Sequence, residues 1–314
     1  VMAGASVDTE VDTQVVESSV WKDAMKFQKY CPHYQLYSQQ LIGAWAISQL
    51  KRVPLWYDMR VGKTWSAIAA YKHARANDEV DMLIVVCPTF NMYDPWLDEL
   101  KSGNLSVSIM DGTAEEDMET VESAARGDVD VLIVNYERVD RRLEAIEDNL
   151  DMARLFIVAD ETSAIKNPES KRSLAMHRLC QKPLYVVLLN GTPCEQGPQD
   201  LWSQMRCIDS KGVVWGQTFA DYASEWLYQY AAGKYTPKNS LDFQVFLSRT
   251  SIRYIRSEAD QFAGRDKTFR YVELPPTKEQ LVQSQNVLQG FLETVSASGD
   301  KKKQGVFDSY IVIA

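Results

Sequence analysis

Two places in the chain combine reactive residue types with the local pattern that would position them. At the first, Gly62-Lys63-Thr64 follows an apolar stretch and opens a probable helix, Thr64 to Ala76. Backbone N–H groups at such a helix start face an anion, a lysine reaches outer phosphates, and a threonine hydroxyl binds magnesium. The first glycine of the usual phosphate-binding pattern is replaced by Tyr57, and a Gly-Lys-Thr triplet also fits a surface turn. The triplet alone leaves both interpretations open.

The second place is the end of the apolar run Phe156 to Ala159, which is followed by Asp160 and Glu161. Carboxylates at the C-terminal ends of parallel strands lie where open α/β sheets bind ligands. Asp160 would then hold a magnesium ion, and Glu161 would polarise an attacking water as general base. A solvated acidic strand end is the alternative. Because Lys63 and both carboxylates occur in one α/β pattern, we expect a site for ATP and Mg²⁺.

A third polar turn follows the apolar run Val186 to Leu189. It reads Asn190-Gly191-Thr192-Pro193. Gly191 and Thr192 could sense the γ-phosphate there and couple its state to the rest of the protein. As a simple Gly-Thr-Pro turn, the segment would have no such role.

Short apolar runs, separated by longer helical stretches, must position these residues. The runs cover residues 53–57, 82–87, 129–134, 155–159 and 185–189. Near-continuous apolar strands that alternate with helices predict a parallel sheet buried on both faces, in a doubly wound α/β domain. Asn167-Pro168 predicts a helix that runs through Cys180, and Pro198 predicts the start of the next one.

The composition fits a folded, non-exported protein. The 314 residues are 45% hydrophobic, and no apolar run approaches the ~20 residues that span a bilayer. The five cysteines are scattered and predict neither a zinc site nor a redox motif. The net charge of −9 counts against a protein coated in nucleic acid, but allows a local basic track. We expect a cytoplasmic protein without membrane contact.

The order of these blocks resembles the Swi/Snf branch of the superfamily-two helicases and translocases, over residues 36–275. The matching blocks are DMRVGKT (58–64), VVCPT (85–89) with Trp96, VLIVNYE (131–137), DETSAIKNPESK (160–171) and LNGTPCEQGPQDLW (189–202). The Ile-Lys-Asn-Pro extension and the Gly-Thr-Pro-to-Leu-Trp feature are specific to that branch. The resemblance implies a RecA-like, P-loop ATPase lobe.

The resemblance also implies which residues bind the nucleotide. Those that hold its phosphates would be Met59, Arg60, Val61, Gly62, Lys63 and Thr64. Thr64 and Asp160 would hold Mg²⁺. The segment LYSQQLIGAW (36–45) is similar to the family's Q motif, so Gln40 would read adenine, with Gln39 as the alternative if the register slips by one.

Contacts with a nucleic-acid backbone are implied in the same way. The residues concerned are Pro88, Thr89, Asn135, Tyr136 and Thr192.

The chain departs from the family after the acidic pair. Thr162, Ser163 and Ala164 replace the Ala-His-Arg that commonly stands there, so the histidine through which the family couples its site is missing.

The resemblance predicts how the chain is divided. We expect a flexible tail over 1–19, the RecA-like lobe over 20–210, a helical, aromatic-rich insertion with a return to the lobe over 211–275, and a linker over 276–314. The linker would lead to a second RecA-like lobe, which completes the ATP pocket in the family. The aromatic residues between Trp215 and Tyr235 fit a small core better than a base-stacking surface.

Together these features predict the first lobe of a DNA-dependent ATPase that moves along duplex DNA and remodels structures on it. A strand-separating helicase shares the nucleotide motifs. A nucleotide-binding docking module without motor activity is the alternative from another class. We expect a monomer, in a bacterial or phage-infected cytoplasm, whose partners are DNA and a second lobe of the same polypeptide.

Overall fold

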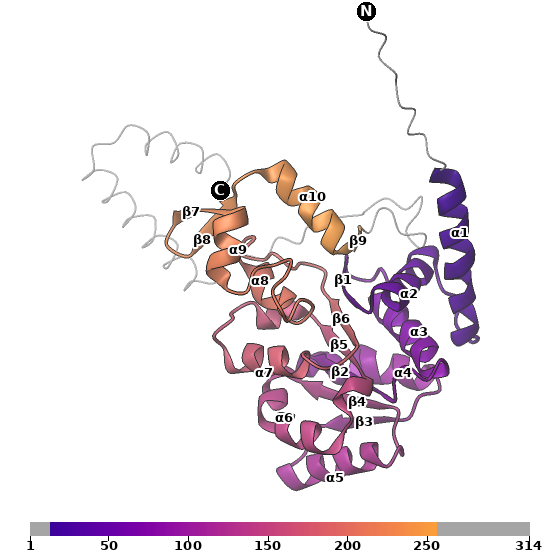
Figure 1. The fold of residues 1–314 in the computed structure, drawn as a ribbon. Helices are drawn as coiled ribbons and strands as arrows, with labels where there is room; N and C mark the ends of the chain where they lie inside the picture. The colour runs from indigo at the N-terminus through magenta and orange to yellow at the C-terminus, as the bar shows by residue number, and fades with distance from the viewer. Residues whose placement is uncertain (1–12, 256–314) are drawn as a thin grey trace, which may run out of the picture. The chain divides into compact units, whose positions relative to one another are not determined.

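A seven-stranded parallel sheet forms the centre of the fold. The computed structural model describes residues 13–255, and its strands follow the order β3-β4-β2-β5-β6-β1-β9. These strands are β1 (Arg52–Tyr57), β2 (Met82–Cys87), β3 (Val107–Met110), β4 (Val131–Asn135), β5 (Leu155–Asp160), β6 (Tyr185–Leu189) and β9 (Ile252–Tyr254). Parallel neighbours need crossover connections, which helices supply here (Figure 1).

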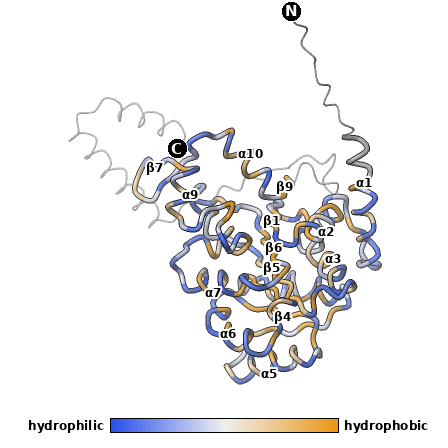
Figure 2. Tube along the Cα trace, viewed as in Figure 1, coloured by the Kyte–Doolittle hydropathy of each residue, from blue (hydrophilic) through white to orange (hydrophobic). Residues whose placement is uncertain are grey.

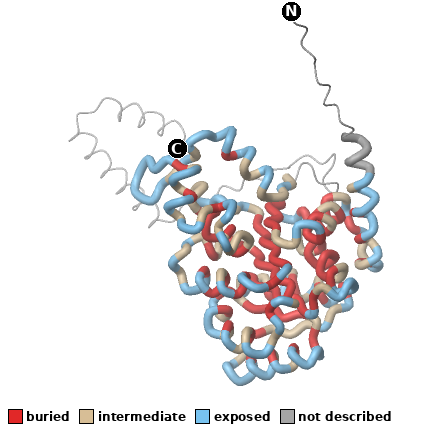
Figure 3. The backbone as a smooth tube through the Cα atoms, viewed as in Figure 1, coloured by how far each residue is buried: buried red, intermediate tan, exposed pale blue. Residues whose placement is uncertain are grey.

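The inner strands are buried on both faces, as their apolar composition predicts. Every residue of β2, β5 and β6 is buried. Figure 2 shows hydrophobic residues gathered along the central strands, and Figure 3 shows the same segments buried. The five strands predicted from apolar runs are confirmed. The sequence does not predict β3 and β9, because these edge strands are short and only partly buried.

Helices cover both faces of the sheet, which confirms the doubly wound arrangement. One face packs against α1 (Thr13–Met25), η1 (Lys26–Tyr30), α2 (Ser38–Leu50), α3 (Lys63–Ala76) and α4 (Asp98–Ser102). The other packs against α5 (Ala114–Ala125), α6 (Tyr136–Asn149), α7 (Lys171–Leu179) and α8 (Asp200–Met205). Short helical segments occupy three connections: η2 (Thr89–Asn91) and η3 (Met92–Leu97) follow β2, η4 (Met152–Arg154) precedes β5, and η5 (Thr162–Ile165) follows β5. In Figure 1, α2 and α3 lie on one side of the strands and α6 and α7 on the other.

The strand register brings three strand ends to one level. β6 lies between β1 and β5, and Leu189 pairs with Leu55 on one side and with Asp160 on the other. Neighbouring strands are about 4.8 Å apart, so the ends of β1 and β5 lie ~10 Å from each other. The turns that follow β1, β5 and β6 therefore meet at one edge of the sheet.

Between α8 and β9 the chain forms a small aromatic subdomain. It contains α9 (Phe219–Trp226), the hairpin of β7 (Leu227–Ala231) and β8 (Lys234–Pro237), and α10 (Ser240–Thr250). The Trp226 and Phe246 rings stack with centroids 4.3 Å apart, and Trp215 lies 4.7 Å from Phe246. The expected aromatic core is confirmed for these rings. The subdomain contains the β7–β8 hairpin in addition to the expected helices, and β9 returns the chain to the sheet beside β1.

Three predicted boundaries differ from the structure. The expected tail over 1–19 overlaps α1, which begins at Thr13 and contains neither proline nor glycine. Helix α7 begins at Lys171 and not at Asn167-Pro168, because the Ser170 hydroxyl accepts a hydrogen bond from the Ser173 N–H and caps it there. Helix α8 begins at Asp200, two residues after Pro198.

Three expectations fall wholly or partly on residues that the structure does not describe. Residues 1–12 of the expected tail, 256–275 of the expected insertion with its return to the lobe, and 276–314 of the expected linker lie outside the described range. Within residues 13–255, no helix is both long enough and apolar enough to cross a bilayer.

Candidate functional site

The loop after β1 turns tightly into α3. Tyr57 ends the strand and Lys63 begins the helix, which confirms the predicted strand-loop-helix unit. Gly62 has a φ of 92°, a left-handed conformation that suits glycine. Lys63 Nζ donates to the Tyr57 carbonyl at 3.0 Å, so the side chain lies back across the loop. The N-terminal end of α3 and the ammonium group together make this loop favourable for an anion.

The other predicted phosphate-binding residues divide into exposed and buried ones. Met59 and Arg60 are exposed, and Arg60 has a φ of 67°. Val61 is fully buried, and its N–H donates to the Asp58 carbonyl at 3.3 Å. The Val61 side chain therefore anchors the loop to the core.

Two buried glutamines connect α2 to this loop. Gln40 Nε2 donates to the Gly62 carbonyl at 3.4 Å, and Gln40 Oε1 accepts from the Tyr37 N–H at 2.8 Å. Gln39 Nε2 donates to the Val61 carbonyl at 3.3 Å. A methyl group on Gly62 would lie 2.0 Å from Gln40 Nε2, so glycine is required for space as well as for φ. Gln40 thus lies at the loop, and its contact with adenine stays a prediction.

Asp160, at the end of β5, is buried and held by several donors. Its Oδ2 accepts from Trp96 Nε1 at 2.9 Å and from Asn91 Nδ2 at 3.3 Å. Its Oδ1 accepts from the Glu161 N–H at 3.0 Å. Burial raises the pKa of Asp160, while the Trp96 bond and the Lys63 charge oppose that rise. The carboxylate is thus fixed in direction and close enough to Lys63 to feel its charge.

Glu161 follows in a left-handed backbone conformation, with φ 52° and ψ 57°. Its side chain is half-buried. Burial raises the pKa of Glu161, the Asp160 charge adds to the rise, and the Lys63 charge opposes it. A raised pKa moves a carboxylate toward the neutral range in which a general base works best.

Glu99, in α4, is a neighbour of the site that the sequence analysis does not identify. It forms a side-chain hydrogen bond with Thr64, and its Oε2 is buried without a hydrogen-bond partner. Burial raises the pKa of Glu99 to about 7, the charges of Asp160 and Asp94 add to the rise, and the bond with Thr64 opposes it. The sequence feature that could have identified Glu99 is its position three residues after Trp96, in the segment that follows β2.

These oxygens fit a magnesium ion that is shared with a nucleotide. Within residues 13–255, no group of three His, Cys, Asp or Glu side chains is placed to hold a metal by itself. Mg²⁺ in nucleotide sites typically uses one or two protein groups together with phosphate oxygens. Thr64 and Asp160 are suitable as those groups, and the Glu99 carboxyl lies beside Thr64.

The turn after β6 lies against the loop after β1. A methyl group added to Gly191 would lie 3.5 Å from both Met59 Cγ and the Met59 backbone nitrogen. Asn190 Oδ1 accepts from the Thr192 N–H at 2.9 Å, and Thr192 is exposed. The two predicted coupling residues thus lie beside the candidate phosphate loop.

The predicted nucleic-acid contacts gather at the same edge, with one exception. Asn135 Nδ2 donates to Thr89 Oγ1 at 3.3 Å, and Thr89 and Thr192 are exposed. Pro88 is half-buried. Tyr136 is buried, and its hydroxyl donates to the Asp160 carbonyl at 2.7 Å. The Tyr136 side chain therefore lies inside the fold and supports the end of β5, while a nucleic-acid contact of this residue stays a prediction.

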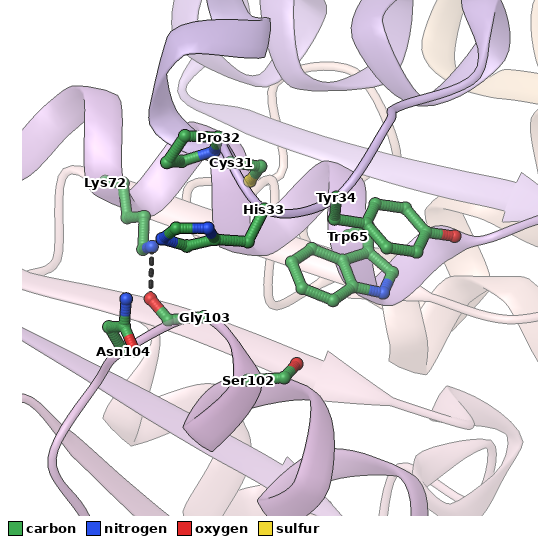
Figure 4. A pocket seen from close by; sticks show the side chains of 9 residues that line it. All are labelled: Cys31, Pro32, His33, Tyr34, Trp65, Lys72, Ser102, Gly103 and Asn104. Atoms are coloured by element: carbon green, nitrogen blue, oxygen red, sulfur yellow. Dashed lines mark hydrogen bonds between the residues drawn. The ribbon is translucent and has the colours of Figure 1, made fainter.

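A pocket of about 200 Å³ lies along α3 (Figure 4). The Tyr34 and Trp65 rings stack there with centroids 4.2 Å apart and an angle of 3° between their planes. The Tyr34 side chain also forms a hydrogen bond with Gln40. Lys72 donates to the Gly103 carbonyl across the pocket. The sequence analysis does not identify this pocket, although Trp65 directly follows Thr64.

Known proteins resemble this chain in sequence. Residues 49–311 match the family described as the SNF2-related domain. The SWI/SNF-related matrix-associated actin-dependent regulator of chromatin subfamily A-like protein 1 of Drosophila melanogaster is 30% identical over 172 residues, which are 53% of this chain and 20% of that protein. Putative protein p41 of Acyrthosiphon pisum secondary endosymbiont phage 1 is 25% identical over 228 residues, 68% of this chain and 48% of that protein. The chain thus spans less than half the length of these two relatives.

A solved structure resembles the chain in fold. The Sulfolobus solfataricus SWI2/SNF2 ATPase core in complex with dsDNA has a TM-score of 0.58 and 22% identity, over 89% of this chain and 57% of that one. This likeness agrees with the RecA-like fold expected from the sequence. Since the family match covers most of its length, the chain belongs to the SNF2-related domain family, the Swi/Snf type of superfamily-two helicase-like proteins.

Proposed function

We propose that this chain is the first lobe of an ATP-dependent DNA translocase, which binds and hydrolyses ATP in order to move on or remodel duplex DNA. The observation that carries the proposal is the meeting of Lys63, Asp160 and Glu161 at one edge of the sheet. The register of β1, β6 and β5 brings the ends of their strands to one level, and the Lys63 charge opposes the rise that burial causes in the pKa of both carboxylates. Hydrolysis of a nucleotide needs a cation at the phosphates and a carboxylate that positions water.

Each residue would have a separate task. Lys63 would exchange its bond to the Tyr57 carbonyl for bonds to phosphate oxygens, which the N-terminal end of α3 also binds. Glu161 would accept a proton from the attacking water. Gln40, which already bonds to Tyr34 and to the loop, would read the adenine.

Mg²⁺, when bound, would neutralise charge on the phosphates. Thr64 and Asp160 would hold it. Trp96 orients the Asp160 carboxylate through its 2.9 Å hydrogen bond. Glu99, hydrogen-bonded to the Thr64 side chain, would keep the hydroxyl lone pairs of that threonine available to the ion.

Duplex DNA is the partner that we propose. The exposed residues Thr89 and Thr192, with Asn135 beside them, would contact its phosphate backbone. A second RecA-like lobe of the same polypeptide would close over the nucleotide, and the closure would move the two lobes along the DNA by turns. The solved structure of similar fold is described as a complex with dsDNA, which supports this choice of partner.

ATP hydrolysis by the natural full-length polypeptide, with and without duplex DNA, tests the proposal. Duplex DNA should raise the rate of the wild type. Glu161→Gln should still bind ATP but hydrolyse it ~10²- to 10⁴-fold more slowly. Glu119→Gln, an exposed carboxylate on α5, is the control and should behave as wild type. Normal ATP turnover by Glu161→Gln would contradict the role of Glu161 as general base. If no nucleic acid changed the ATP hydrolysis rate of the wild type, the proposed translocase function would be contradicted.

A further inference from the structure

Three buried polar side chains join the ends of β5 and β6. Thr162 Oγ1 donates to Gln204 Oε1 at 2.6 Å, and Asn190 Nδ2 lies 3.3 Å from Thr162 Oγ1 and 3.4 Å from Gln204 Oε1. Their exposed fractions are 0%, 1% and 0% for Thr162, Gln204 and Asn190. Thr162 directly follows Glu161, and Asn190 directly precedes Gly191. We call Thr162, Asn190 and Gln204 the buried triad.

The surroundings of the buried triad fix which atom donates and which accepts. Gln204 Nε2 donates to the carbonyls of Pro193 at 2.8 Å and Asp200 at 2.9 Å, so Gln204 Oε1 must face Thr162. Asn190 Oδ1 accepts from the Thr192 N–H, so Asn190 Nδ2 must face the triad. An amide offers donors on one side only, and backbone groups set both amides here. Hydrogen bonds therefore run without a break from Thr162 to the Thr192 N–H.

Stability alone does not account for these polar groups. Three apolar side chains of similar shape can be as stable in a core as a hydrogen-bonded set, whereas a half-satisfied set is costly. A fully bonded network, in contrast, fixes one arrangement of the segments that carry it. An ion pair between Lys166 and Glu195, at 2.6 Å, also joins the two turns, but both side chains are partly exposed and such pairs hold weakly.

We propose that the buried triad is a positioning relay between Glu161 and the turn at Gly191 and Thr192. A shift of the turn moves Asn190, and the hydrogen bonds of Asn190 and Gln204 transmit this shift to Thr162. The Thr162 backbone is continuous with that of Glu161. The relay rests on the proposed function for the roles of Glu161 and Thr192.

Amide hydrogen exchange at Thr192, measured by NMR in this chain, tests the relay without any need for activity. Thr162→Val keeps the side-chain volume and removes the hydroxyl, so exchange at Thr192 should rise by ~2- to 30-fold, the range of coupling effects along such networks. Thr162→Ser keeps the hydroxyl and should restore protection. Unchanged exchange in Thr162→Val would overturn the relay.

A matched control excludes a general loss of packing. Ser203→Ala removes a hydroxyl that is equally buried, donates to the Ile165 carbonyl at 2.6 Å and lies next to Gln204, but outside the buried triad. This variant should leave exchange at Thr192 unchanged, and a rise equal to that of Thr162→Val would overturn the relay. If Thr162→Val does not fold, Gln204→Met takes its place with the same expected result, because it removes the bonds that Gln204 Oε1 accepts from Thr162 and Asn190.

A second readout separates the relay from the proposed function. In the natural full-length polypeptide, the ratio of DNA-stimulated to basal ATP hydrolysis should fall by ~2- to 30-fold in Thr162→Val and recover in Thr162→Ser. An unchanged ratio would overturn the coupling role. Raised exchange at Thr192, combined with a wild type that DNA does not stimulate, would support the relay and contradict the proposed function.

Discussion

The two sides of the candidate site are built in different ways. On the phosphate side, the loop after β1 depends on backbone conformation, with positive φ at Arg60 and Gly62, and on a lysine that bonds to its own loop. On the carboxylate side, side-chain hydrogen bonds fix the strand ends, as those from Trp96 to Asp160 and from Thr162 to Gln204 do. On the phosphate side, Lys63 would exchange its bond to the Tyr57 carbonyl for bonds to a nucleotide. On the carboxylate side, Asp160 is already held in place by Trp96. Prearranged groups of this kind act in catalysis without reorganisation.

Among variants that leave Lys63 and both carboxylates in place, a large effect should come from Gly62→Ala, which disturbs the backbone of the phosphate side. Alanine at this φ is strained by ~1–3 kcal/mol, and its methyl group would displace Gln40. We expect ATP affinity to fall by ~10-fold or more, which corresponds to about 1.4 kcal/mol. Titration of ATP into the chain measures this loss.

Gly127→Ala is the control for Gly62→Ala. Gly127 also has a positive φ, 81°, but a methyl group there meets nothing within 4 Å. It should lower the free energy of unfolding through strain and leave ATP affinity as it is. Equal ATP affinity in both variants would mean that the contact with Gln40 has no part in binding.

Trp96→Phe should have an effect of similar size on the carboxylate side. The phenyl ring fills most of the space but cannot donate to Asp160, and a bond to a charged group contributes ~1.5–3 kcal/mol. The rate of ATP hydrolysis by the natural full-length polypeptide should fall by ~10-fold or more, and half-maximal activity should need more Mg²⁺. Trp202→Phe is the control, because Trp202 Nε1 donates to the Gly216 carbonyl at 3.4 Å, outside the site. The same Mg²⁺ dependence in both variants would contradict the role of Trp96.

The smallest effect concerns His177. Its Nε2 bonds at 2.7 Å to the carbonyl of Ser203, the residue before Gln204 of the buried triad. Burial lowers the pKa of His177 below 6.5, although that bond opposes the fall. Since the unfolded chain then takes up the proton more readily, the stability contributed by neutral His177 is present above about pH 6.5 and is lost as the pH falls toward the folded pKa. In wild type, the free energy of unfolding should decrease between about pH 7.5 and 5.5. In His177→Gln this decrease should be smaller by at most about 1 kcal/mol, as measured by urea unfolding at both pH values. An identical loss in wild type and variant would contradict this, and His33→Gln, an exposed histidine, is the control.

The sequence predicts the buried strands better than the edges of the fold. β2 and β5 are recognisable because burial on both faces requires nearly continuous apolar runs. β9 contains three residues and is only partly buried, so composition hardly constrains it. The hairpin of β7 and β8 is mostly exposed and carries aromatic residues that fit a helix equally well.

The same difference applies to the site. Residues that we propose to touch phosphate or water, such as Lys63 and Glu161, follow strands and have characteristic neighbours in the sequence. Residues that hold those groups, such as Glu99 and Gln204, come from distant segments, and only the fold brings them to the site. Tyr136 shows the limit most clearly, since its position in the sequence does not reveal that the side chain turns inward to the Asp160 carbonyl.

Binding of Mg-ATP to this chain, measured by isothermal titration calorimetry, tests the central claim most directly. Lys63→Ala should lose binding, because the ammonium group that meets the phosphates is gone. Lys101→Ala, an exposed lysine in α4, should bind as the wild type does. Equal affinity in Lys63→Ala and wild type would contradict the assignment of the loop after β1 as the phosphate site.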